Sequence, residues 1–288
     1  MRPSWPGGRR RKLLVNHVKL KTAAELTGIV QTVLFCPEDL ALIKSGAAER
    51  RAFLDHAICQ LRPRYGEALA QYHKLLDHKT RILRDWEKNP SLLEVLEDFN
   101  EAMARAGALL IHYRAHFVGK LAPRAAQIQR DFSGDREELT LSYQTVGTVR
   151  NPLGPTVSIY EDLRAHQDSH RRAELEARSC LSGPHKDDLA AWIDGQPARQ
   201  FASQGQTRTA ALSLKLAERE LFEDDTGQWP VLLLDDVLSE LDARRQDFVL
   251  DRITGGQVFI TSCEAPAGEI SRGKILHIHQ GALVDSPN

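Results

Sequence analysis

The sequence VLLLDDVLSELD (residues 231–242) sets four apolar residues before two adjacent carboxylates and a short Ser-Glu-Leu-Asp tail. Such an apolar run predicts a buried strand that ends by placing Asp235 and Asp236 at the edge of a sheet. Paired carboxylates can serve a nucleotide-bound metal there, because the first coordinates the ion and the second positions or deprotonates an attacking water. We therefore predict Asp235 as a Mg²⁺ ligand and Asp236 as a catalytic residue. A strand followed by acidic loop residues is also common in proteins without such a site.

A second stretch, FASQGQTRTAALSLKLAERELF (residues 201–222), places a polar turn immediately before a long helical pattern. The hydroxyl of Ser203 and the free backbone N–H groups around Gly205 would lie at the positive end of the helix dipole, where anions bind. The alternative is an ordinary helix cap made by Ser203. The spacing to the carboxylate strand favours an anion site, so we predict nucleotide contacts from Ser203, Gln204, Gly205 and Gln206.

These stretches match the Walker B strand and the signature turn of ABC-type ATPases, and the SELD tail resembles a D-loop. The D-loop resemblance adds Ser239 and Asp242 to the predicted nucleotide contacts. Read with LSGPHKDDL (181–189) and VLFCPEDLALIKSGAAERRAFLD (33–55), the motifs resemble the RecF family of bacterial DNA replication and repair ATPases. The resemblance covers nearly the whole chain, from about residue 11 to about residue 285.

The resemblance implies an α/β fold, in which an incomplete ABC-type P-loop ATPase head carries an inserted helical domain. We expect residues 1–36 to supply the first strands of the head, residues 37–178 the helical domain, and residues 179–288 the rest of the head. The resemblance also implies ATP and Mg²⁺ as cofactors, DNA binding and an ATP-dependent homodimer. Its partners would be RecO and RecR, in recombinational repair of gaps and the loading of RecA.

One family motif is missing from these 288 residues: they contain no G-x-x-x-x-G-K-[ST] loop, whose amides and lysine cradle the β and γ phosphates. RecF proteins carry that loop close to the N terminus. Its absence indicates either a fragment that starts inside the first domain or a protein that has lost the loop. We expect this chain alone to bind ATP weakly or not at all, and its activity as an enzyme stays open. The alternative function is a non-catalytic DNA- or protein-binding module that has lost ATP hydrolysis.

Local patterns predict the elements around these motifs. Residues 12–35 are strand-like with a hairpin turn at Asn16-His17, and helical periodicity follows from Pro37 to about residue 130. The later elements form a layered α/β core. They are a strand over 138–146, a helix over 158–181, a hairpin at Asp194-Gly195, a helix over 207–222, the strand at 231, a helix over 239–253, a strand over 257–261 and a closing strand pair over 274–285.

Charge is distributed unevenly along the chain. Residues 1–132 carry 22 Lys and Arg against 14 Asp and Glu, whereas residues 133–288 carry 16 against 25. A basic half attracts polyanions, and Arg50, Arg51, Arg62 and Arg64 are candidates for DNA phosphate contacts. Solvated helix faces are the alternative for the same residues. No apolar run reaches about 18 residues, so we expect no membrane span and a cytoplasmic protein.

Overall fold

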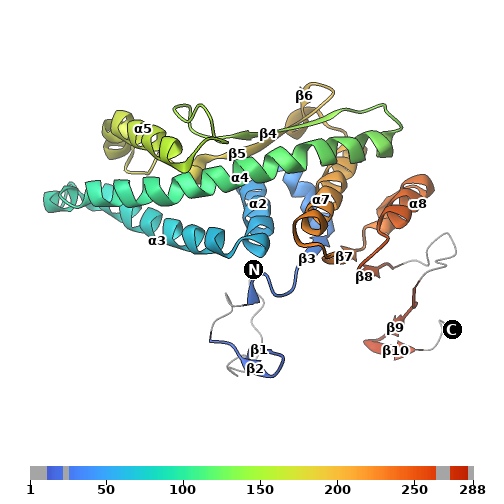
Figure 1. The fold of residues 1–288 in the computed structure, drawn as a ribbon. Coiled ribbons are helices and arrows are strands. Elements are labelled where there is room, and N and C mark those ends of the chain that lie inside the picture. Colours follow the sequence, from blue (N-terminus) through green and yellow to red (C-terminus); the bar gives the residue numbers. More distant parts are fainter. Residues whose placement is uncertain (1–11, 22–25, 264–272, 285–288) are drawn as a thin grey trace.

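The computed structural model describes residues 12–21, 26–263 and 273–284, without the side chain of Glu240. Figure 1 shows one long helix, α4, running along most of the molecule, with α2, α3, α5 and α7 packed against it. The helices are α1 (Ala41–Lys44), α2 (Ala47–Leu61), α3 (Pro63–Asp85), α4 (Leu96–Ser133), α5 (Thr156–Ala177), α6 (Ala198–Phe201), α7 (Gln204–Thr226) and α8 (Ala243–Arg252), with 3₁₀ turns η2 (Pro37–Leu40), η3 (Pro90–Leu93), η4 (Pro184–Lys186) and η5 (Leu238–Glu240).

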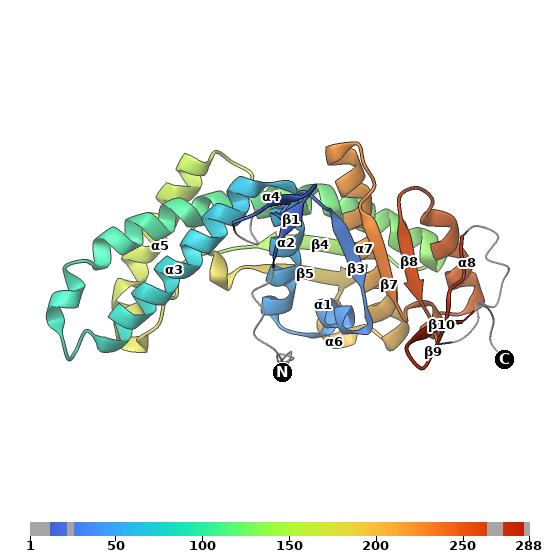
Figure 2. The same ribbon diagram turned by 90° about the horizontal axis from the view of Figure 1, so that it is seen from below.

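The sheet that carries the carboxylates is parallel, with the strand order β3 (Thr32–Phe35), β7 (Val231–Asp235), β8 (Val258–Thr261). Val33, Phe35, Leu232 and Leu234 are buried, because alternate side chains of these strands point toward the helices. Strands β3 and β7 are about 200 residues apart in the sequence and still pair, as Figure 2 shows from below. The helical segments between them are therefore an insertion into one sheet.

A second, antiparallel sheet has the order β4 (Leu139–Gln144), β5 (Asp188–Ile193), β6 (Gln196–Pro197). Its tight turn lies at Asp194 and Gly195, whose φ angles of 51° and 74° suit a two-residue hairpin of the predicted kind. The hairpin β1 (Leu14–Val15) and β2 (Val18–Lys19) turns in the same way at Asn16 and His17. The hairpin β9 (His277–His279) and β10 (Ala282–Val284) ends the described chain. Among the described residues, we find no helix that could span a membrane.

The basic first half and the acidic second half neutralise each other inside the fold. Cations of α2, α3 and α4, and Arg62 between α2 and α3, form ion pairs with acids far along the chain, and two of these pairs are buried. The pairs are Arg50–Asp188, Arg62–Asp225, Lys79–Glu174, Arg114–Asp187 and Arg124–Asp224. Part of the excess of basic residues in the first half therefore pairs with acidic residues of the second half.

This pairing bears on the predicted DNA contacts. Arg50 is buried and holds Asp188 through two hydrogen bonds of 2.6 and 2.9 Å, and Arg51 donates to the backbone carbonyl of Asp187 at 2.8 Å. Arg62 makes a two-point contact with Asp225. These three guanidinium groups therefore stabilise the fold through contacts within the chain. The sequence alone does not reveal this role. Arg64 is exposed.

A buried polar network joins the loop before β5 to α2, α4 and β4. Arg114 of α4 donates to both carboxylate oxygens of Asp55 at 2.8 and 3.0 Å and to the carbonyl of Pro184 at 2.8 Å. Its Nη1 lies 3.6 Å from Oδ2 of Asp187, and the same oxygen accepts a hydrogen bond from the hydroxyl of Tyr143. Because charged groups away from water need partners, this network fixes the loop against α2 and α4.

The same loop holds a neutral histidine. Tyr72 Oη lies 2.7 Å from Nδ1 of His185, and Nε2 of that ring lies 3.1 Å from the carbonyl of Cys180. The imidazole satisfies both contacts when it accepts from Tyr72 and donates to Cys180. Burial lowers the pKa of His185 from 6.5 to about 4. The loop therefore needs an uncharged ring.

We expect stability to fall as the pH drops from 6.5 to 4, because unfolded His185 takes up a proton across this window and the folded ring does not. The contribution of this residue is about 3 kcal/mol. Burial raises the pKa of the Asp187 carboxyl, which makes the folded protein more stable as the pH falls and so opposes the effect of His185. The contribution of His185 is therefore measured by comparing the wild type with a variant that lacks the histidine. Urea unfolding of the wild type and His185→Gln should show that the difference between their free energies of unfolding shrinks as the pH falls from 7 to 4. A difference that stays constant over this range would contradict the assignment.

Candidate functional site

The carboxylate pair lies where β7 ends. Asp235 is exposed, and its Oδ1 accepts a hydrogen bond of 2.5 Å from the hydroxyl of Thr261 on β8. The parallel register of β7 and β8 sets these two residues side by side. Asp236 follows with a φ of 52°, a left-handed conformation that Asp tolerates better than most residues. The chain thus turns sharply and presents two carboxylates at the edge of the sheet.

The D-loop segment is fixed by its own hydrogen bonds. The hydroxyl of Ser239 lies 2.8 Å from Oδ1 of Asp236 and 2.9 Å from its carbonyl oxygen. Asp242 caps α8, since its Oδ1 accepts from the N–H of Arg245 at 3.0 Å. Gln246 closes the turn by donating to the carbonyls of residues 238 and 241. Both predicted D-loop residues therefore have local partners within the chain.

The signature turn begins α7 with a capping box. Ser203 Oγ accepts from the N–H of Gln206 at 3.2 Å, and Gln206 Oε1 accepts from the N–H of Ser203 at 3.0 Å. These side chains make the ordinary helix cap that was the alternative to an anion site. The backbone N–H groups of Gln204 and Gly205 belong to the first turn of the helix, where amides have no intrahelical partner. Gln204 is exposed at that position.

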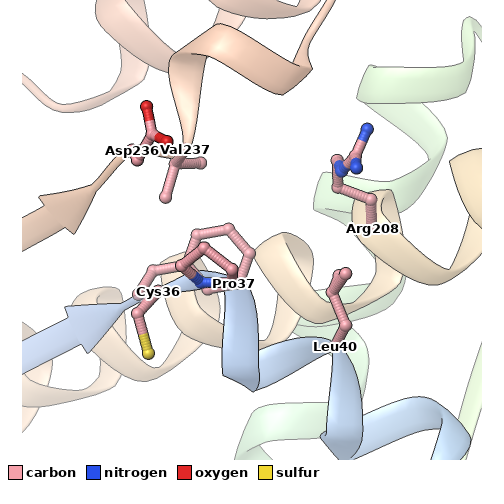
Figure 3. A pocket seen from close by; sticks show the side chains of 7 residues that line it. Cys36, Pro37, Leu40, Arg208, Asp236 and Val237 are labelled. Carbon is pink, nitrogen blue, oxygen red and sulfur yellow. The ribbon is translucent and has the colours of Figure 1, made fainter. Parts of the chain in front are cut away.

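The structure brings the three motifs to one region. A Cβ atom at Gly205 would lie 3.8 Å from Nη1 of Arg245, which in turn lies 3.4 Å from Asp242. Arg208, one turn further along α7, lines a small hollow together with Asp236 and residues 35–37 and 40 (Figure 3). The hollow has a volume of about 10 Å³, which is room for about one water molecule. The ends of β3 and β7 and the start of α7 thus form a single rim.

The residues at this rim fit a Mg²⁺–nucleotide ligand. Mg²⁺ prefers oxygen donors and is held in such sites by one or two carboxylates, with waters and phosphates completing its shell. Asp235 and Asp236 are donors of this kind, and among the described residues no three His, Cys, Asp or Glu side chains form a closed metal cage. The first amides of α7, near Arg208, suit phosphate. The rim therefore has the side chains and amides that an open metal position and an anion position would need.

Sequence analysis did not identify three residues that contribute to this rim. Thr261 contacts both carboxylate residues, Arg245 lies against the signature turn, and Cys36 begins the turn that lines the hollow. The available signal for Thr261 was the strand QVFIT, which pairs in parallel with β7 and so ends beside it. Lys215, another cation of α7, lies farther along and forms ion pairs with Asp39 and Glu218.

Known proteins resemble this chain over most of its length. No family model matches the chain. The "DNA replication and repair protein RecF" of Clostridioides difficile (strain 630) is 35% identical over 286 residues, which cover 98% of this chain and 76% of that protein. The RecF protein of Desulforamulus reducens is 40% identical over 254 residues, covering 88% and 67%.

Two solved structures show the same fold. The "recombination mediator protein RecF-ATPrS in RecFOR pathway" has a TM-score of 0.85 at 34% identity and covers 94% of this chain and 72% of that one. The corresponding RecF-ATP structure has a TM-score of 0.83 at 35% identity, covering 93% and 71%. The α/β fold of an ABC-type ATPase head, expected from the motifs, is confirmed. The chain belongs to the RecF family of DNA replication and repair proteins.

Proposed function

We propose that the protein acts in DNA replication and repair as an ATP-dependent homodimer of RecF type. Each copy presents its signature turn, Ser203 to Gln206, to a nucleotide held mainly by the other copy. Asp235 binds the Mg²⁺ that accompanies the nucleotide, and Asp236 positions or deprotonates the attacking water. Ser239 and Asp242 approach the same nucleotide from the D-loop. The dimer would also bind DNA and work with RecO and RecR in loading RecA. The description of a similar protein as a recombination mediator in the RecFOR pathway supports this role.

One observation carries the proposal: Arg208 of the signature helix and Asp236, which follows β7, line the same hollow. An ATP sandwich requires both an amide-lined turn and a metal carboxylate on a single face of each copy. In the described chain Arg208 and Asp236 line one hollow, which supports such an arrangement. The proposed head (1–36 and 179–288) gains support from the pairing of β3 with β7 across the helical segments. The proposed helical domain (37–178) contains β4, which pairs with β5 of the head, so the two parts also share a sheet.

The test uses the full-length product of the gene and sedimentation velocity with ATP and Mg²⁺. We expect a monomer that becomes a dimer on addition of MgATP and returns to monomer after EDTA. Ser203→Arg places a bulky cation in the turn and should abolish the dimer while leaving the Kd of a labelled ATP analogue within about twofold. Ser91→Arg, at an exposed position of η3, is the matched control and should dimerise normally.

The outcomes separate the alternatives. Dimerisation of Ser203→Arg at wild-type concentrations would show that the signature turn lies outside the dimer interface. A wild-type protein that stays monomeric at saturating MgATP, yet binds DNA in a salt-sensitive manner regardless of ATP, would favour the non-catalytic binding module instead.

A further inference from the structure

Thr261, the last residue of β8, contacts both carboxylate residues of the rim. Its hydroxyl lies 2.5 Å from Oδ1 of Asp235 and 3.1 Å from the backbone nitrogen of Asp236. Its carbonyl oxygen lies 3.2 Å from the same nitrogen. The parallel register that pairs Asp235 with Thr261 produces all three contacts. One side chain on a neighbouring strand therefore holds two consecutive residues of the candidate site.

The chemistry of a hydroxyl determines the direction of these contacts. It has one proton to donate and two lone pairs that accept. Asp236 N–H can only donate, so the hydroxyl accepts from it and gives its own proton to the Asp235 carboxylate. The terminal torsion of an Asp side chain is broad, so an exposed carboxylate without such a partner samples many orientations. Thr261 therefore fixes the plane of the Asp235 carboxylate and leaves Oδ2 for another ligand.

We propose that Thr261 is a positioning residue of the metal site, which orients Asp235 toward the nucleotide-bound Mg²⁺ and secures the left-handed turn at Asp236. This inference rests on the proposed nucleotide function of the rim. Ser239 differs from Thr261, because its hydroxyl contacts Asp236 and not Asp235. Groups that orient a metal ligand from behind change metal affinity or activity by about 10- to 100-fold when they are removed.

The test separates orientation of the metal ligand from support of the strand. Thr261→Val keeps the shape and the strand preference of the side chain and removes the hydroxyl, whereas Thr261→Ser keeps the hydroxyl. The full-length product is titrated with a labelled non-hydrolysable ATP analogue, first in EDTA and then across a series of Mg²⁺ concentrations. The measured quantities are the Kd in EDTA and the Mg²⁺ concentration that gives half of the maximal increase in affinity. Thermal unfolding of each variant is recorded in parallel, and Thr261→Ala is the substitute if the valine variant does not fold.

We expect Thr261→Val to retain the wild-type Kd in EDTA and to need about tenfold more Mg²⁺. Thr261→Ser should lie within about twofold of the wild type in both quantities, because its hydroxyl can make the same contacts. An unchanged Mg²⁺ midpoint in the valine variant would overturn the proposal, and so would an equal shift in the serine variant. If the wild type itself shows no Mg²⁺-dependent binding, the nucleotide function of the rim fails together with the role of Thr261, a result distinct from the first two.

Discussion

Asp235→Asn is expected to lower the ATP turnover of the full-length product by at least about two orders of magnitude while its Kd for ATP stays within a few-fold of the wild type. The substitution keeps the shape of the side chain, and the amide oxygen still accepts the hydrogen bond from Thr261. What it removes is the negative charge that a Mg²⁺ ligand supplies. Metal stabilisation of a developing charge contributes several kcal/mol to phosphoryl transfer, and each 1.4 kcal/mol is about a factor of ten in rate.

The measurement pairs steady-state ATP hydrolysis with equilibrium binding of a labelled analogue. Asp247→Asn is the matched control, since it removes one carboxylate from an exposed position of α8, the helix that follows the D-loop. That control should hydrolyse ATP at the wild-type rate. Unchanged turnover in Asp235→Asn would remove this carboxylate from the metal site, and loss of binding in parallel with turnover would show a wider effect on the nucleotide pocket.

Arg114→Met is expected to destabilise the fold by about 3 to 5 kcal/mol, the usual cost of removing one partner from a buried ion pair. The guanidinium is 3% exposed and contacts Asp55, Asp187 and the carbonyl of Pro184. Methionine fills a similar volume but leaves two carboxylates without their cation, one of which already has an unpaired buried oxygen, Oδ1 of Asp187. The loop before β5 would lose its attachment to α4.

Urea unfolding followed by circular dichroism gives the free energy for this variant. Arg105→Met on the same helix is the control, because Arg105 is 74% exposed and its pair with Glu101 lies on the surface. Surface pairs of this kind contribute about 0.3 to 0.5 kcal/mol, so the control should unfold almost as the wild type does. Should Arg114→Met fail to fold, Arg114→Lys retains a charge and provides a measurable intermediate. A loss below about 1 kcal/mol for either variant of Arg114 would mean that the network contributes little.

Local patterns were sufficient for most elements of the fold. The hairpins at Asn16-His17 and Asp194-Gly195 were predicted from residue types that favour turns, and the structure shows positive φ angles at all four residues. The strand at 231 and the helices of the insertion followed from hydrophobic periodicity. Boundaries were less certain: α7 begins at Gln204 and not near residue 207, because the Ser203 cap starts the helix as soon as the polar turn ends.

Long-range pairing was what the sequence could not provide. Thr261 reaches Asp235 only because β7 and β8 pair in parallel after the connection through α8, and no local pattern encodes that register. The excess of basic residues before residue 133 suggested a polyanion partner, whereas several of these side chains meet acids far along the chain. The order of the motifs indicated which residues belong to one site. The distances between their side chains could be known only from the folded structure.

The left-handed backbone of Asp236 has a consequence for the range of side chains that this position accepts. Glycine and asparagine occupy such a conformation readily, whereas valine, isoleucine and threonine would strain it. A saturation library screened only for soluble, folded protein should therefore return a short set of residues, and a second screen for hydrolysis should narrow that set to aspartate. Residues found only in the first set would satisfy the backbone geometry at position 236 but not the reaction. The difference between the two sets would therefore separate these two requirements.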